Sequence, residues 1–167
     1  MSRIFAVDPS IVNIGWCITD TESFRWGTFH PKAKDDLRLP EIRQFIISKI
    51  KDEIPDYCVV EKAAHYSYEK HKYHSGKSFS QKTMQVMSWA YAVILEAMLS
   101  CCDNVDTPLP IEYKPKRGII CMSLEDMKPI LQAQLGNDAK FNEHEAHAIW
   151  MARWKAYQLK MERMRVK

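Results

Sequence analysis

The first twenty residues carry the pattern that most constrains the fold. An apolar run, residues 4–7, ends in the carboxylate of Asp8, and a second apolar run, residues 14–18, follows a turn that contains Pro9 and Asn13. Two apolar runs joined by turn residues predict a β-hairpin. Because an unpaired carboxylate is costly to bury, Asp8 either begins the turn, meets a cation, or lies at the rim of a site.

The next elements repeat this pattern after a helix. Residues 23–29 alternate weakly and predict a third strand of an antiparallel meander, and residues 40–54 have the apolar spacing of an amphipathic helix. Residues 56–61 form another short apolar run that ends in a carboxylate, Glu61. A helix between two such runs predicts a crossover to a parallel strand. Asp8 and Glu61 would then share the sheet edge where open α/β folds bind ligands.

Residues 62–82 combine positive charge with aromatic rings. Five lysines and one glutamate give this segment a formal charge of +4, with histidines, tyrosines and a phenylalanine interleaved. Cations that meet phosphates and rings that stack on bases suit nucleic acid, whereas the alternative is a solvated polar loop. The side chains that we expect to contact nucleic acid here are Lys62, Tyr66, Tyr68, Lys70, Lys72, Tyr73 and Lys77.

The second half of the chain is mainly helical. Residues 81–102 carry an apolar surface that is typical of a core helix but wide enough for part of it to build a dimer interface. The proline-rich segment 103–115 predicts a loop, and residues 118–122 predict a last short strand. Ser123 caps the following helix, which runs to Gly136.

A final helix begins near Asn142. Its first turn, Asn142-Glu143-His144-Glu145, is dense in metal-binding groups, and Asn142 and Glu145 stand three apart on one face. The same residues also suit a helix start, because asparagine is a good N-cap and acids favour the positive end of the helix dipole. The residues alone leave both interpretations open.

Composition excludes several classes of protein. The 167 residues have a net charge of +3, no apolar run of membrane-spanning length and no signal-peptide pattern. The five cysteines lack any Cys-x-x-Cys spacing, which argues against a zinc or disulfide framework. We therefore expect one domain, residues 1–167, inside the cell, in the cytoplasm or nucleoid, including those of a virus- or phage-infected host.

The separated acids predict a common pocket. Asp8, Glu61 and the pair of Asn142 and Glu145 would converge on one site, and oxygen-rich clusters of this kind hold Mg²⁺ or Mn²⁺. Two such ions about 3.5–4 Å apart stabilise the attacking and leaving oxygens at a phosphate. The sequence has no glycine-rich phosphate loop, Ser-His-Asp set or cysteine nucleophile to compete for this role.

These segments resemble RuvC-type Holliday junction resolvases, which share the ribonuclease H fold. Residues 4–18 are similar to the family's opening hairpin, residues 59–62 to its second acidic strand, and residues 145–149 to the acid-Ala-x-Ala run of its last helix. The resemblance covers nearly the whole chain and extends to compact poxviral and phage resolvases. It implies an α/β fold with a ribonuclease H-like mixed five-stranded sheet flanked by helices.

The resemblance also implies roles for individual residues. Its metal-binding catalytic acids are Asp8, Glu61 and Glu145. Asn142 stands where the family usually has an aspartate or sometimes a histidine, so the metal site is completed by Asn142, Glu143 or His144.

Two lysines outside the acidic segments also match the family. Lys128 resembles a family lysine that supports cleavage by contacting phosphate, and Lys140 is a weaker match to a second. The family segment that follows the second acid contacts the junction crossover, which agrees with the composition of residues 62–82.

The expected protein is a homodimeric, Mg²⁺-dependent endonuclease that nicks symmetric strands of four-way DNA junctions, with Mn²⁺ as a substitute ion. A dimer with two sites matches the two-fold symmetry of a junction. A ribonuclease H-like nuclease for flaps or RNA–DNA hybrids stays open. A junction-binding module without catalysis also stays open, because Asn142 departs from the family pattern. An actin-like ATPase shares the opening hairpin, but the chain is too short for its two lobes.

Overall fold

The computed structural model describes residues 2–20, 23–34, 37–62, 81–114, 116–117, 120–121 and 123–165. Its main sheet consists of β1 (Ile4–Asp8), β2 (Ile14–Thr19), β3 (Phe24–Phe29), β4 (Tyr57–Val60) and β5 (Val105–Asp106). A separate two-stranded sheet consists of β6 (Lys116–Arg117) and β7 (Ile120–Cys121). The helices are α1 (Arg38–Glu53), α2 (Gln81–Leu99), α3 (Pro110–Tyr113), α4 (Leu124–Leu135) and α5 (Glu143–Arg165).

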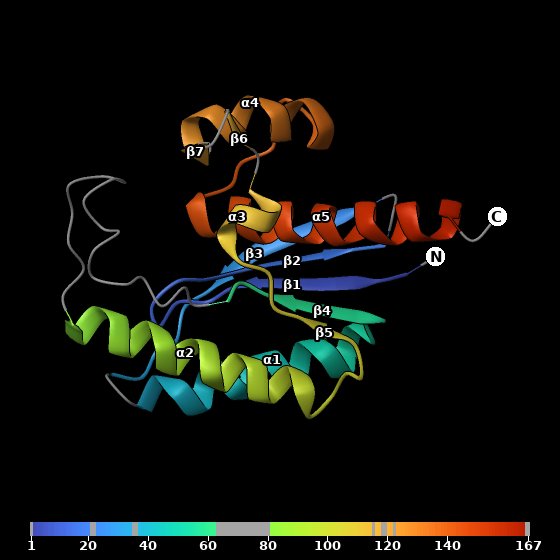
Figure 1. Ribbon diagram of the computed structural model, residues 1–167. Helices are drawn as coiled ribbons and strands as arrows, with labels where there is room; N and C mark the ends of the chain where they lie inside the picture. Colours follow the sequence, from blue (N-terminus) through green and yellow to red (C-terminus); the bar gives the residue numbers. More distant parts are fainter. Residues whose placement is uncertain are drawn as a thin grey trace.

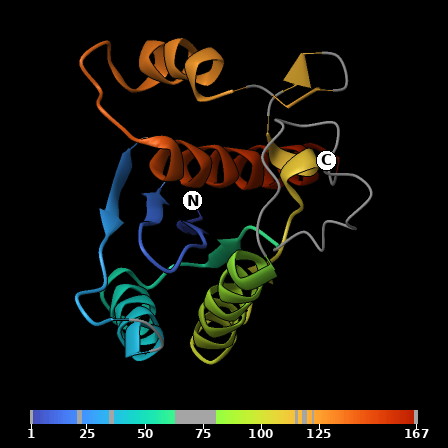
Figure 2. The ribbon, with the colours of Figure 1, turned by 90° about the vertical axis from the view of Figure 1, so that its left-hand side faces the viewer.

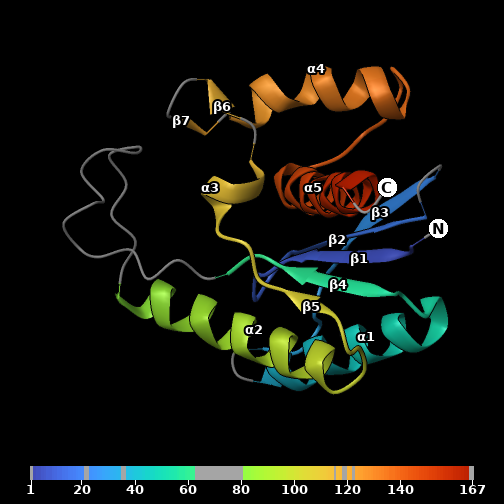
Figure 3. The same cartoon turned by 45° about the vertical axis from the view of Figure 1, so that its right-hand side comes forward.

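The main sheet lies between two layers of helices (Figure 1). Helices α1 and α2 lie side by side on one face, and α5 crosses the other face (Figure 2). Helix α4 packs on α5 on the side away from the sheet, as a view from a third direction also shows (Figure 3). The predicted mixed five-stranded sheet with flanking helices is therefore confirmed. Within the described residues, no helix combines the length and apolar character needed to span a membrane.

The opening hairpin forms the centre of the sheet, as predicted. The antiparallel pairing of β1 and β2 sets Asp8 opposite Gly15, and β3 continues the meander beyond β2. Every residue of β1 is buried because its alternate side chains enter two cores. Ala6 packs in the core that includes α5, whereas Phe5 and Val7 pack in the core that includes α1 and α2. This two-sided burial explains the uninterrupted apolar run.

The predicted crossover brings the two acids to one edge. Strand β4 pairs with β1 in parallel, and Val7 lies opposite Val60. The residue after each of these valines is acidic: Asp8 follows Val7, and Glu61 follows Val60. The amide nitrogen of Glu61 donates a hydrogen bond of 3.3 Å to the carbonyl oxygen of Val7. Both acids therefore emerge at the carboxyl-terminal edge of the two central strands.

The fifth strand differs from the expectation. Residues 103–115 were predicted to form a loop, but they contain β5, which pairs in parallel with β4, and the short helix α3. Of residues 118–122, the described ones form β7, which pairs with β6 outside the main sheet. A strand of two residues is too short to show an apolar period, so the prolines around it led to the prediction of a loop.

The later helices agree with their predicted boundaries. The Ser123 hydroxyl caps α4 by accepting a hydrogen bond of 3.3 Å from the amide of Asp126. Gly136 ends α4 with a φ of 109°, which favours glycine. Helix α5 begins directly after Asn142, so its described part lies within the predicted final helix.

Gly15 allows α5 to approach β2 closely. A Cβ atom at this position would lie 2.3 Å from the carbonyl carbon and oxygen of His144, in the first turn of α5. Because both atoms belong to backbone, the helix itself would have to move. Residue 15 therefore sets how near the start of α5 lies to the end of β1.

We predict that Gly15→Ala lowers the free energy of unfolding by about 2 kcal/mol through this overpacking. Gly27→Ala is the matched control, because the atoms nearest to its Cβ belong to a side chain, the partly buried indole of Trp16, and not to backbone. Urea unfolding of both variants measures the difference. Equal losses at the two glycines would contradict the close-approach explanation.

Candidate metal centre

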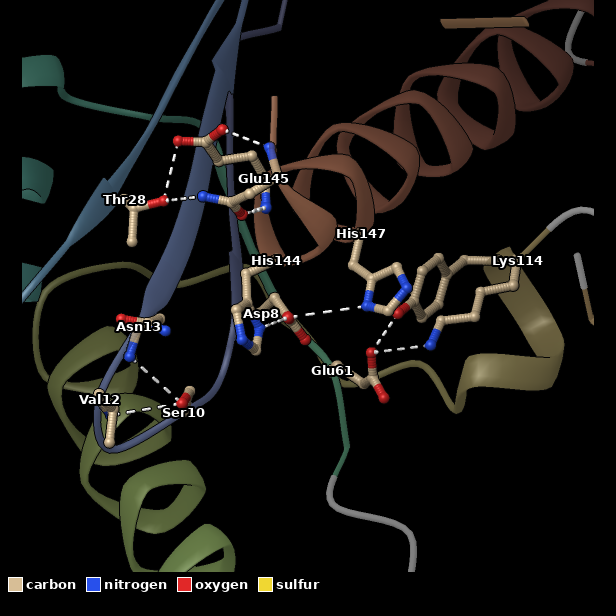
Figure 4. A network of polar contacts seen from close by, with 12 residues as sticks. Asp8, Ser10, Val12, Asn13, Thr28, Glu61, Lys114, His144, Glu145 and His147 are labelled. Carbon is tan, nitrogen blue, oxygen red and sulfur yellow. Dashed lines mark hydrogen bonds and ion pairs between the residues drawn. The ribbon is translucent and has the colours of Figure 1, made fainter. Parts of the chain in front are cut away.

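Two carboxylates and two imidazoles meet at the edge of β1 and β4 (Figure 4). One ligand atom from each of Asp8, Glu61 and His147 lies within 4.8 Å of the other two. The Nδ1 atom of His144 lies 2.6 Å from Asp8 Oδ2, and Nδ1 of His147 lies 3.7 Å from the same oxygen. We call these four residues the edge cluster.

The two imidazoles come from one face of α5. His147 is three positions after His144, so their side chains project to the same side of the helix. The close approach at Gly15 brings this turn down onto the hairpin. Asp8, which is only 7% exposed, thereby obtains a partner for its buried carboxylate.

Asn142 and Glu145 do not belong to the edge cluster. The Oδ1 atom of Asn142 accepts from the amide of Glu145 at 3.0 Å, and Oε2 of Glu145 accepts from the amide of Asn142 at 2.8 Å. This reciprocal pair is a capping box. Thr28 on β3 holds both side chains, since its hydroxyl donates to Glu145 Oε1 at 2.8 Å and accepts from Asn142 Nδ2 at 2.7 Å.

The expectation that Glu145 and Asn142 meet Asp8 and Glu61 is therefore corrected. Figure 4 shows the Glu145 carboxylate directed toward Thr28 and away from Asp8. The physical reason is the helix-start chemistry that the sequence left open as the second interpretation. The spacing Asn-x-x-Glu is itself a capping signal. If Asn142 and Glu145 are assigned to the cap, the histidines of the same turn are left as the candidate metal ligands.

Glu61 has partners that the sequence did not suggest. The hydroxyl of Tyr113, at the end of α3, donates a hydrogen bond to Glu61 Oε2. The ammonium nitrogen of Lys114 lies 3.8 Å from the same oxygen. Tyr113 is buried, with 4% of its surface exposed, so its side chain fixes the orientation of the carboxylate. The unexpected helix α3 thus supplies the second layer of the edge cluster.

The environment separates the protonation behaviour of the two acids. Burial raises the pKa of Asp8, but the hydrogen bond with His144 and the nearby imidazole of His147 outweigh burial and leave this pKa below its ordinary value. Burial and then the charge of Asp8 raise the pKa of Glu61, against the opposing charge of Lys114. The hydrogen bond to Asp8 raises the pKa of His144, against the opposing effect of burial.

This donor set fits a divalent cation. The carboxylates and imidazoles bind metals in their deprotonated forms, so an ion would take the place of the protons that the edge cluster otherwise carries. Tyr113 and Lys114 orient one ligand from outside, as the outer partners of metal ligands do in general.

Of the predicted DNA-contacting lysines that the structure describes, Lys128 and Lys140 lie apart from the edge cluster, whereas Lys62 adjoins it in the chain. Lys128 on α4 and Lys140 before α5 line one cavity of about 520 Å³, together with Gln132 and Phe141, and no member of the edge cluster lines it. Lys62 is exposed and directly follows Glu61. The remaining predicted contacts lie outside the described residues: Tyr66, Tyr68, Lys70, Lys72, Tyr73 and Lys77.

We predict that Asn142→Ala lowers the free energy of unfolding by about 1 kcal/mol, because α5 loses its N-cap. Asn142→Ser is expected to retain most of the stability, since serine caps helices about as well as asparagine. Chemical unfolding of the two variants checks this. Equal losses in alanine and serine variants would contradict a capping role.

Solved structures of RuvC share this fold. The complex of T. thermophilus RuvC with a Holliday junction substrate aligns with a TM-score of 0.70 and 15% sequence identity over 96% of each chain. A structure of Thermus thermophilus RuvC aligns with a TM-score of 0.65 and 17% identity, again over 96% of each chain. No family model and no curated protein matches the chain by sequence. At this level of identity, the likeness establishes that the chain has the fold of RuvC.

Proposed function

We propose that this protein is a divalent-metal-dependent endonuclease that resolves four-way DNA junctions, with residues 1–167 as one nuclease domain. The observation that carries the proposal is the convergence of Asp8, Glu61 and His147 at one edge of a RuvC-like sheet. The RuvC structure solved with a Holliday junction substrate supports branched DNA as the substrate class.

The edge cluster supplies the groups that hold the ion. Asp8, Glu61 and His147 are its direct ligands, and a bound divalent ion supplies activation of water and stabilisation of the charge that develops on the phosphate. Tyr113 and Lys114 hold the Glu61 carboxylate in a fixed orientation.

The reaction is an in-line displacement at phosphorus. The oxygen of a water molecule forms a bond to phosphorus while the bond from phosphorus to the 3′ oxygen breaks. The leaving oxygen takes a proton, so the products are a 3′-hydroxyl and a 5′-phosphate. Lys62, one residue beyond Glu61, is positioned to contact the DNA backbone near the cut.

Paired cuts in a symmetric junction require two sites, so we propose a homodimer. On α2, Met87 is 40% exposed and Trp89 is 39% exposed. Large apolar side chains of this kind are enriched in protein interfaces. A dimer formed through α2 would present two edge clusters to the two strands.

We predict that Asp8→Asn reduces cleavage of a four-way junction about 100-fold or more in the presence of divalent ions, because a buried anionic ligand is lost. Asp103→Asn is the matched control, since Asp103 is exposed and lies outside the edge cluster. Gel assays of single-turnover cleavage measure the rates.

The same assay separates the rival functions. A junction, a flap, an RNA–DNA hybrid and a linear duplex are offered at equal concentration. Faster cleavage of the hybrid or flap would favour a ribonuclease H-like enzyme, and tight junction binding without any cut would favour a binding module. Unchanged cleavage by Asp8→Asn would contradict the assigned site.

We predict that the protein sediments as a dimer and that Trp89→Glu shifts it to a monomer, because a charge would be buried in the contact. Tyr157→Glu provides the control, since Tyr157 is 62% exposed on α5 and lies on a different helix. Sedimentation equilibrium measures the mass of each. A dimer that survives Trp89→Glu would place the contact elsewhere.

A further inference from the structure

We propose that the edge cluster selects a first-row transition-metal ion over magnesium, and that His147 is the residue that determines this choice. The inference rests on the proposed function in taking the edge cluster to be the metal site of the nuclease. It changes the identity of the ion, because the family resemblance implies Mg²⁺.

His147 is placed as a direct ligand. It is the member of α5 whose ring nitrogen lies within 4.8 Å of both an Asp8 oxygen and a Glu61 oxygen. Its side chain is only 14% exposed, so the imidazole is enclosed at the edge of the sheet. Figure 4 shows the ring directed toward the two carboxylates. An ion bound between Asp8 and Glu61 therefore meets one nitrogen as well as the carboxylate oxygens.

One nitrogen ligand changes which ions the site favours. Magnesium prefers oxygen donors in near-ideal octahedral geometry and gives up its water reluctantly. Imidazole is a good ligand for the first-row transition metals. Asp8, Glu61 and a neutral His147 also carry a formal charge of −2, whereas a third carboxylate would make it −3. Magnesium, whose binding is largely electrostatic, loses more from this reduction than a metal that bonds well to nitrogen.

His144 has a different part in the cluster. Its Nδ1 atom lies 2.6 Å from Asp8 Oδ2, within hydrogen-bond distance, but it is outside the group of mutually close ligand atoms. We therefore assign His144 as a positioning residue that orients Asp8. Its loss would weaken the binding of every ion, because Asp8 serves them all, and would leave the preference between ions unchanged.

The test is metal binding without DNA. Isothermal titration calorimetry at a fixed pH of about 7.5 measures the affinities of the full chain for Mn²⁺ and for Mg²⁺, and electron paramagnetic resonance of free Mn²⁺ provides an independent count of bound ions. Mn²⁺ is the demanding probe, because it is the weakest binder of the first-row dications. We expect Mn²⁺ to bind at least about tenfold more tightly than Mg²⁺.

Three variants identify the residue responsible. His147→Asp converts the ligands to oxygen alone, so the preference for Mn²⁺ is expected to fall about tenfold or more. His144→Gln is expected to lower both affinities by similar factors. His30→Asp is the control: it makes the same histidine-to-aspartate change at an exposed residue outside α5. It is expected to change the affinity for neither Mn²⁺ nor Mg²⁺.

The outcomes are distinct from those of the proposed function. A Mn²⁺ preference that is lost in His147→Asp and retained in His144→Gln supports the inference. Equal affinities, tighter Mg²⁺ binding, no binding of either ion, or an unchanged preference in His147→Asp overturns it. Failure to cut junctions while Mn²⁺ is bound selectively would contradict the nuclease and leave the ion selectivity established.

Discussion

The parallel pairing of β1 and β4 is the constraint on which the candidate site depends. The register that sets Val7 opposite Val60 delivers Asp8 and Glu61 to a single edge. Two carboxylates so placed repel each other and lose hydration, so the surrounding structure must supply protons, cations or hydrogen-bond donors. The histidines of α5, together with Tyr113 and Lys114, supply these groups at the edge.

The start of α5 decides which side chains reach that edge. Adjacent helix residues are rotated by about 100°, so the pair His144 and His147 lies about 200° from the pair Asn142 and Glu145. The capping box turns Asn142 and Glu145 toward Thr28. The histidines consequently face Asp8. A single local interaction therefore sets the rotation of the helix and the chemical character of the site.

Much of the fold could be predicted because its signals are local. The hairpin, α1 and β4 were predicted from apolar runs and spacing within a few residues. The placement of the two acids at one edge followed from the helical crossover, which makes β1 and β4 parallel. Strand β5 and helix α3 were missed because two and four residues are too few for a period. Tyr113 and Lys114 were missed with them, since only α3 brings them beside Glu61.

The sequence alone determined that Asp8 and Glu61 share one edge of the sheet and that a turn rich in metal-binding groups begins the last helix. The sequence also indicated that residues of this turn cap the helix or bind a metal, but it did not show which residue has which role. Only the tertiary structure assigned them. The contact of Gly15 with the backbone of His144 and the hydrogen bonds of Thr28 fix the depth and rotation of α5, and both contacts join segments that are distant in the chain. The spacing of residues along the chain does not define this rotation, because any two residues three positions apart in the turn lie on one face of the helix. Only contact with a neighbouring strand decides which of these faces packs on the sheet.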